Sequence, residues 1–292
     1  MAKIGLIQVE IIEGQGLEER QDMLCNLVEA TLKEGADIVC LPEAFQYLSC
    51  REIIFTPERL TEVSEKWQKR LGELAKKYHA YIAPWDYYYN SEDGRVYNSA
   101  YILDREGEFM GRYCKCNLTQ NELEIKGLAN GMEFPVFDLD IGRVAIMICF
   151  DNYFPEVAAA YGAQDVDLLI YPLYGDTLKP QWEHKMRARA IDHSMYVLSC
   201  QNDNKYDIAY SGLVDKYGEV IAKLDKPQSY KVVEVDLKHR VLTHTTGRQE
   251  YIEDVHDYLH RCRNHTAFKK LAERGTPHKT WEEIFFDNVP DK

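Results

Sequence analysis

The sequence has no apolar stretch long enough to cross a lipid bilayer, which argues against a membrane-spanning protein. Its first residues, Met1-Ala2-Lys3, lead directly into the apolar run 4–9. This run is too short for the apolar core of a secretory signal peptide followed by a cleavage site, and it favours a first β-strand. We therefore expect a cytoplasmic protein that does not bind membranes.

Basic residues are in the minority, with 35 Lys and Arg against 48 Asp and Glu and a formal net charge of −13. No cluster of basic residues is present that would neutralise a phosphate backbone, so we expect no nucleic-acid partner. The eight cysteines are scattered along the chain. Without a secretory signal, this distribution favours reduced thiols over a disulfide framework.

Internal repeats and low-complexity linkers are also missing, and 292 residues suffice for one large domain. Short apolar runs predict buried strands at 4–9, 37–41, 144–148, 167–171 and 195–201. An aromatic-rich run predicts a further strand at 80–89, and Pro172 is expected in a loop. Apolar residues at helical spacing predict helices at 17–33, 58–78 and 180–193. This alternation predicts an α/β domain over residues 1–240. Residues 241–292 are more polar, with amphipathic pieces at 265–273 and 280–286, and we interpret them as an extension that packs on the domain or on a partner subunit.

The chain is organised around residues 143–156, where a predicted strand leads to Cys149 and then to the start of a predicted helix. Pro155 and Glu156 suit a first helical turn, and Gly162 suits the end of that helix. Free N–H groups and the dipole at a helix N-terminus favour a thiolate and an oxyanion beside it. A buried structural cysteine is the alternative interpretation of the same stretch.

Two charged residues have a placement similar to that of Cys149. Glu43 follows the predicted strand 37–41, and Lys115 lies near the end of the extended run 108–118. Ligand-binding and catalytic groups in α/β sheets gather beyond the carboxyl ends of strands. A carboxylate there is suited to take the thiol proton, and an ammonium is suited to stabilise an oxyanion. Spacing alone does not show that the three side chains meet, and each also suits an ordinary solvated position.

Several blocks of this sequence, in order, resemble the nitrilase or carbon–nitrogen hydrolase superfamily. They are Leu41-Pro42-Glu43, Tyr97-Asn98-Ser99-Ala100, Gly111-Arg112-Tyr113-Cys114-Lys115, Cys149-Phe150-Asp151 with Phe154-Pro155-Glu156, and Ser211-Gly212-Leu213-Val214-Asp215. The resemblance covers residues 3–236. It implies an α/β fold, a four-layer α-β-β-α sandwich with two mixed β-sheets, and a homodimer or larger homo-oligomer.

The resemblance also implies roles for particular residues. Cys149 matches the family nucleophile, Glu43 the general base and Lys115 the catalytic lysine. Glu122 is the match for a second glutamate found in many members, with Glu124 as its competitor. The sequence departs from the common pattern at Cys114 and Tyr153, two positions often occupied by Arg, and near Ala83-Pro84-Trp85, where glycines are usual. These departures bear on the identity of the substrate.

The function expected from these residues is hydrolysis of a non-peptide C–N bond in a small amide or N-carbamoyl substrate. Cys149 would form a thioester, with Glu43 as base and with Lys115 and the Phe150 N–H stabilising the oxyanion. Tyr153 and Tyr174 are candidates for lining the substrate pocket. No cofactor or metal is expected in this chemistry.

Three alternatives remain from the sequence. The same thioester would also serve an acyltransferase, and the fold would also serve a non-catalytic binding or assembly protein. A papain-like Cys–His enzyme would use His184 or His193 as its base.

Two groups of residues have the types that bind metals. They are Cys114 with Cys116, and His256, His260, Cys262 and His265. Neither group has a matching second pair, so no metal site is expected.

Overall fold

A computed structural model describes residues 1–44, 56–175, 181–203, 209–244, 252–264 and 266 of the chain. The helices are α1 (Leu17–Lys33), α2 (Pro57–Tyr78), α3 (Pro155–Gly162), α4 (Gln181–His193) and α5 (Val255–Cys262), with a π-helical turn η2 (Asn121–Ile125) and a 3-10 turn η3 (Cys149–Tyr153). The strands of the first half are β1 (Ala2–Glu10), β2 (Ile38–Cys40), β3 (Tyr81–Ala83), β4 (Trp85–Asn90), β5 (Arg95–Leu103), β6 (Phe109–Cys114) and β7 (Val136–Leu139). Those of the second half are β8 (Gly142–Ile146), β9 (Leu168–Leu173), β10 (Tyr196–Asp203), β11 (Gly212–Val214), β12 (Val220–Lys223), β13 (Ser229–Val235), β14 (Leu242–His244) and β15 (Ile252–Asp254).

Strand β1 joins two groups of strands into one continuous hydrogen-bonded sheet. Its described path runs β4-β5-β3-β2-β1-β10-β9-β8-β7, with β6, β11, β12 and β13 attached at the sides. Along residues 2–8, β1 pairs with β13, and only residues 8–10 pair with β10. The two groups, β4-β5-β3-β2-β1 and β10-β9-β8-β7, are therefore joined through the short pairing of β1 with β10, which spans three residues. Parallel pairs of β1 with β2 and β10 combine with antiparallel hairpins, so both groups are mixed.

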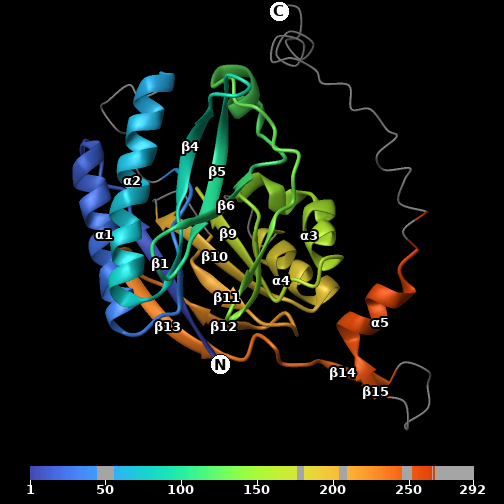
Figure 1. Cartoon of the computed structure of the whole chain (residues 1–292). Helices are drawn as coiled ribbons and strands as arrows, with labels where there is room; N and C mark the ends of the chain where they lie inside the picture. The colour runs from blue at the N-terminus through green and yellow to red at the C-terminus, as the bar shows by residue number, and fades with distance from the viewer. Residues whose placement is uncertain (45–55, 176–180, 204–208, 245–251, 265, 267–292) are drawn as a thin grey trace, which may run out of the picture.

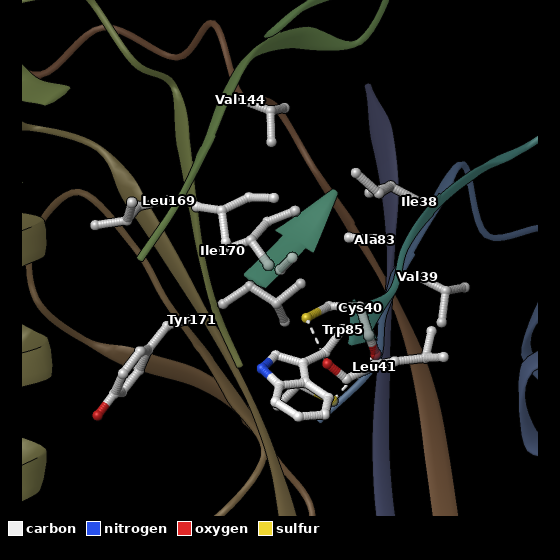
Figure 2. Packing of buried hydrophobic residues seen from close by; sticks show 14 of the residues in the cluster. Ile38, Val39, Cys40, Leu41, Ala83, Trp85, Val144, Leu169, Ile170 and Tyr171 are labelled. Atoms are coloured by element: carbon white, nitrogen blue, oxygen red, sulfur yellow. Dashed lines mark hydrogen bonds between the residues drawn. The ribbon is translucent and has the colours of Figure 1, made fainter. Parts of the chain in front are cut away.

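The helices cover the outer faces of these two groups of strands. Helices α1 and α2 lie together on one side of the strands, and α3 and α4 lie on the other side (Figure 1). This is the predicted α-β-β-α layering of a nitrilase-like fold. Between the layers, buried side chains from β2, such as Ile38 and Cys40, share one apolar cluster with Leu169 and Ile170 of β9 (Figure 2). Burial of this apolar surface is the main driving force that holds the layers together.

Most predicted elements match the structure, with one clear exception in the strand expected near 80–89. Pro84 interrupts that strand and separates β3 from β4, because proline has no N–H to give to a ladder. Pro172, expected in a loop, lies inside β9, where its Cα is paired with that of Cys200. The amphipathic pieces predicted at 265–273 and 280–286 lie outside the described residues, apart from residue 266.

The extension beyond residue 240 contributes the hairpin β14–β15 and helix α5, neither of which was predicted. His256 at the start of α5 contacts the main body through His193 O (2.9 Å) and Asp165 Oδ1 (2.8 Å). The domain boundary at residue 240 stays a prediction. None of the helices in the described parts of the chain is both long enough and apolar enough to span a membrane.

Candidate active site

A sharp turn after strand β8 presents Cys149. The residue has a positive φ of 45°, in the left-handed region that non-glycine residues seldom occupy. The chain then continues into η3 and into α3, which begins at Pro155 as predicted. A strained backbone of this kind persists only where the surrounding structure holds it in place. The turn therefore fixes the sulfur at the end of the strand.

A buried lysine lies between two buried glutamates. Lys115 Nζ is 3.0 Å from Glu43 Oε1 and 3.0 Å from both carboxylate oxygens of Glu122. Lys115 is 1% exposed, Glu43 3% and Glu122 6%. Buried charges are tolerated only when they are paired and hydrogen-bonded. Residues 43, 115 and 122, distant in the sequence, therefore form one charged cluster.

Asn98 on β5 connects the two glutamates. Its Nδ2 donates to Glu43 Oε1 (2.7 Å) and to Glu122 Oε1 (2.6 Å). Trp85 Nε1 donates to Asn98 Oδ1 at 2.6 Å, which fixes the orientation of the amide. Each carboxylate also accepts a backbone N–H, that of Tyr174 at Glu43 Oε2 and that of Thr119 at Glu122 Oε2, both at 2.8 Å. The sequence placed Asn98 in a motif but gave it no role.

Charge and burial act in opposite directions on this cluster. Burial tends to lower the pKa of the Lys115 ammonium, but the negative charges of Glu43 and Glu122 outweigh it, and the pKa lies well above its usual value. Burial tends to raise the pKa of the Glu122 carboxyl, but Lys115 and the hydrogen bonds from Thr119 and Asn98 lower it overall. Lys115 is thus a cation and Glu122 an anion at neutral pH.

Cys149 lines the same pocket as Glu43 and Tyr174, so the Glu43 charge acts on its thiol at close range. Burial and the charge of Glu43 raise the pKa of this thiol well above its usual value, and they outweigh Lys115 and the Tyr174 N–H. This differs from the expectation that the helix N-terminus favours a thiolate. The resting group is a thiol that shares its pocket with the Glu43 carboxylate, and this arrangement suits a general base.

Asp151 ties the cysteine turn to the lysine segment. Its carboxylate accepts Ile148 N at 2.9 Å on the cysteine side. On the lysine side it accepts Tyr113 OH at 2.7 Å and Asn117 N at 2.8 Å. Residues 113 and 117 flank Lys115, so one carboxylate sets the spacing between nucleophile and lysine. The sequence placed Asp151 beside Cys149 in a motif block but gave it no part in positioning Lys115.

A pocket of about 240 Å³ opens at the cluster of Cys149, Glu43, Lys115 and Glu122. Its other walls are formed by Ala44, Tyr87, Thr119, Asn121, Lys126 and Tyr174. Among the described residues, neither Phe150 nor Tyr153 lines it. In a 3-10 turn residues i and i+3 lie on the same face. Phe150 and Tyr153 accordingly pack on each other, with ring centroids 5.3 Å apart. Of the residues proposed for substrate contact, only Tyr174 lines this pocket among the described residues.

The residues that the sequence offered as alternative catalytic groups do not line the pocket among the described residues. Glu124 is exposed, whereas Glu122 contacts Lys115. His193 lies at the end of α4, where its Nδ1 accepts a hydrogen bond from Arg263, and among the residues described it does not line the pocket; nor does His184. Within the described ranges no group of three or more His, Cys, Asp or Glu residues has the arrangement of a metal site.

Comparison with known proteins places these features in a family. The family model for carbon–nitrogen hydrolases matches residues 3–244. Curated relatives include the omega-amidase NIT2 of Xenopus tropicalis, 28% identical over 253 residues, which cover 82% of this chain and 91% of the relative. The human omega-amidase NIT2 is 29% identical over 251 residues, 81% of this chain and 89% of that protein.

Solved structures show the same fold at lower identity. An amidase from Nesterenkonia sp. superposes with a TM-score of 0.74 at 17% identity and covers 92% of this chain and 96% of its own. Nit3 of Saccharomyces cerevisiae, described as a member of branch 10 of the nitrilase superfamily, gives 0.69 at 22% identity over 80% of this chain and 90% of its own. The match of the family model over residues 3–244 shows that the chain belongs to the carbon–nitrogen hydrolase family.

Proposed function

We propose that the chain hydrolyses a non-peptide C–N bond of a small amide or N-carbamoyl substrate through a thioester on Cys149. The observation that carries this proposal is the placement of a thiol, a carboxylate and an ammonium at one pocket. Glu43 lines the same pocket as Cys149, and its Oε1 lies 3.0 Å from Lys115 Nζ. Curated relatives named omega-amidase support an amide as substrate.

The first step transfers the Cys149 proton to Glu43. The raised pKa of the thiol keeps the proton on sulfur in the free enzyme, so deprotonation accompanies attack on the carbonyl carbon. A C–S bond forms, and the electron pair of the C=O bond moves onto oxygen. Lys115 donates a hydrogen bond to this oxyanion, and the backbone N–H of Phe150, next to the nucleophile, supports it.

The second step breaks the C–N bond. Protonated Glu43 gives its proton to the nitrogen, and ammonia or an amine leaves while the acyl group stays on sulfur as a thioester. Glu43, again a carboxylate, then takes a proton from water. The hydroxide attacks the thioester, the acid leaves, and the proton on Glu43 returns to Cys149. No step requires a metal or a cofactor, because Glu43 carries every proton.

Glu122 acts on the cluster rather than on the substrate carbon. Its carboxylate contacts Lys115 Nζ with both oxygens at 3.0 Å and shares the Asn98 amide with Glu43. This holds the lysine extended and charged. We assign Glu122 the role of keeping Lys115 aimed at the oxyanion position.

Ammonia release measured over a panel of amides, N-carbamoyl compounds and nitriles tests the proposal. Full-length Cys149→Ala and Cys149→Ser should lose about 10³-fold or more in turnover. Cys116→Ser is the matched control, because Cys116 is a partly buried thiol close to Lys115 that does not line the pocket. Full turnover by Cys149→Ala would refute the thioester route.

Adding hydroxylamine separates hydrolysis from acyl transfer. A hydrolase releases mainly free acid, whereas an acyltransferase with the same thioester yields mainly the hydroxamate. If no substrate is turned over and Cys149 reacts with a mild electrophile no faster than the other thiols do, the non-catalytic alternative holds instead.

A further inference from the structure

A tyrosine that the proposed mechanism does not use holds the backbone of the nucleophile. Tyr171 lies on β9, next to β8, and is 1% exposed. Its ring extends away from the other labelled residues of the apolar cluster (Figure 2). Its hydroxyl donates a hydrogen bond to the carbonyl oxygen of Cys149 at 3.1 Å. The cysteine turn is therefore tied to the neighbouring strand at the nucleophile itself.

This hydrogen bond also fixes the direction of the N–H that follows. A peptide group is planar and trans, so the Cys149 C=O and the Phe150 N–H belong to one rigid unit and point in opposite directions. The Tyr171 hydroxyl lies on the carbonyl side of this unit, so the Phe150 N–H points away from Tyr171. A rotation of the unit would break the hydrogen bond and redirect the N–H at the same time.

The Phe150 N–H is not used inside its own turn. Phe150 is the second residue of η3, and the first N–H groups of a helical turn have no acceptor within it. The residue before the turn, Ile148, is extended (φ −120°, ψ 122°), so the 3-10 pattern does not continue backwards to supply one. Cys149, which provides the other half of this peptide unit, lines the pocket. The N–H is therefore suited to bind a substrate oxygen.

The backbone at Cys149 needs such support. Its φ of 45° is seldom adopted by a residue other than glycine, and a strained conformation persists only where its surroundings hold it. A hydrogen bond donated to a peptide C=O also polarises the peptide, which makes its N–H a stronger donor. Tyr171 thus acts on both the direction and the strength of the Phe150 N–H.

We propose that Tyr171 is a positioning residue for the oxyanion site, whose hydroxyl holds the Cys149–Phe150 peptide with the Phe150 N–H aimed at the oxygen of the reacting carbonyl. The inference rests on the proposed function for the roles of Cys149 and Phe150. Among the described residues Tyr171 does not line the pocket, so it acts through the peptide and not on the substrate. Loss of an oxyanion donor costs about 10²- to 10³-fold in kcat. Loss of a group that only aims the donor should cost less, about tenfold.

Tyr171→Phe removes only the hydroxyl, and Tyr161→Phe is its matched control. Tyr161 is fully buried, and its hydroxyl donates to the backbone oxygen of Ile146 on β8 at 2.6 Å. The N–H of that peptide, Met147 N, is already paired with Ile170 O at 2.9 Å and does not serve an oxyanion. Both variants lose one tyrosine hydrogen bond to a backbone carbonyl, so both should lower the melting temperature. Only Tyr171→Phe should lower kcat about tenfold with KM unchanged.

Two reagents applied to the full-length chain separate aiming from stability and need no substrate. Butyraldehyde adds to the Cys149 thiol: a C–S bond forms, the electron pair of the C=O bond moves onto oxygen, and this oxygen takes the thiol proton. The oxygen of the resulting thiohemiacetal occupies the oxyanion site. Methyl methanethiosulfonate has no carbonyl group; the Cys149 sulfur attacks its sulfur, an S–S bond forms and methanesulfinate leaves.

Mass spectrometry follows the labelling of Cys149 by the thiosulfonate, and protection by butyraldehyde gives the affinity of the aldehyde. Tyr171→Phe should weaken butyraldehyde about tenfold and leave the labelling rate without aldehyde unchanged, since only the aldehyde adduct places an oxygen at the Phe150 N–H. Tyr161→Phe should change neither quantity.

The outcomes separate the inference from the proposed function. Equal aldehyde affinities in Tyr171→Phe and Tyr161→Phe, or a parallel loss of affinity and labelling rate in Tyr171→Phe, would overturn the inference, while continued release of ammonia would keep the hydrolase. Weaker aldehyde binding in Tyr171→Phe alone, in a chain that hydrolyses no amide, would keep the oxyanion site and reject the hydrolase. A natural chain that forms no aldehyde adduct would also overturn the inference.

Discussion

Asn98 illustrates how one neutral side chain organises charged ones. A side-chain amide has two N–H hydrogens on one nitrogen, and here each faces a different carboxylate, Glu43 or Glu122. Trp85 holds the amide oxygen on the far side, so the amide cannot rotate without losing three hydrogen bonds. The two glutamates are therefore held around Lys115 in one geometry.

Replacing Asn98 by Ala should lower kcat by about 10²-fold, because both carboxylates lose a donor and the base shifts from its reacting position. KM should change little, since Asn98 does not line the pocket among the described residues. Steady-state kinetics over a pH series measure the effect. Asn90→Ala, at the half-buried end of β4 in the same hairpin, is the control. A rise in KM at constant kcat would contradict a positioning role.

Glu122 gives a prediction about acid stability. Its pKa is lowered in the folded chain, so its ionised form stabilises the fold above the unfolded value of about 4.3. That stabilisation is lost as the pH falls through the lowered folded value. Urea unfolding should show a gap in free energy between the natural chain and Glu122→Gln that is largest near neutral pH and shrinks below about pH 4. Glu124→Gln, at an exposed neighbour, should show no such gap.

The sequence and the structure agree on individual residues where a motif identifies them. Cys149, Glu43 and Lys115 were selected from motif blocks, and the structure brings them to one pocket. Asn98 and Asp151 were not given their roles, because their partners lie far away in the sequence, 55 residues for Asn98 and Glu43. Such contacts arise from strand pairing and leave no periodic pattern in the chain.

At the scale of elements, the loop that contains Ala129 and Gly131 is hydrogen-bonded to Val96 on β5 and to Lys115, which follows β6. Gly131 N donates to Lys115 O at 2.9 Å, and Ala129 N donates to Val96 O at 2.9 Å. A Cβ at Gly131 would lie 2.0 Å from Cys114 O. No side chain fits there, so the loop approaches the lysine strand only because residue 131 is glycine.

Gly131→Ala should therefore displace the loop and Lys115 with it, and we expect a loss in kcat of at least tenfold together with lower stability. Gly72→Ala is a matched control, because its Cβ would lie 2.7 Å from another backbone oxygen, Gly107 O, between α2 and the turn after β5. Gly72→Ala should lower the melting temperature and leave kcat of the folded protein near normal. Equal losses of kcat in both variants would show that the clash acts only through global stability.

Long elements with a strong apolar pattern were predicted well from the sequence, and the short elements of the extension were missed. Helix α1 spans Leu17–Lys33 as its spacing indicates, with Leu24 and Val28 buried. Helix α5 has no buried residues among those described. It is held by polar contacts such as His256 to Asp165. Val255, Tyr258, Leu259 and Cys262 do follow helical spacing, but the stripe is only two turns long and lies in a segment that is polar overall, so it was overlooked.

At the scale of the whole molecule, the extension meets the main body around His193. The His193 ring packs beside Gly162 at the end of α3. A Cβ added at Gly162 would lie 2.4 Å from His193 Nδ1. Arg263 donates to the same Nδ1 at 3.2 Å, and His256 donates to His193 O. Since an arginine only donates, the Nδ1 of His193 carries no proton. The sequence offered His193 as a catalytic base, whereas the structure makes it a junction of α3, α4 and the extension.

This junction predicts a specific pH dependence of stability. Burial and the nearby charges of Arg263 and Arg189 lower the pKa of His193 to about 4, against about 6.5 when unfolded. Between these values the unfolded chain binds a proton that the folded chain does not, so stability falls by up to about 3 kcal/mol as the pH drops from 6.5 to 4. Urea unfolding at several pH values should show this slope in the natural chain and a shallower one in His193→Gln. His244→Gln, at an exposed position in β14, should retain the full slope. An unchanged slope in His193→Gln would mean that the histidine stays accessible to protons, and that the extension does not seal it in solution.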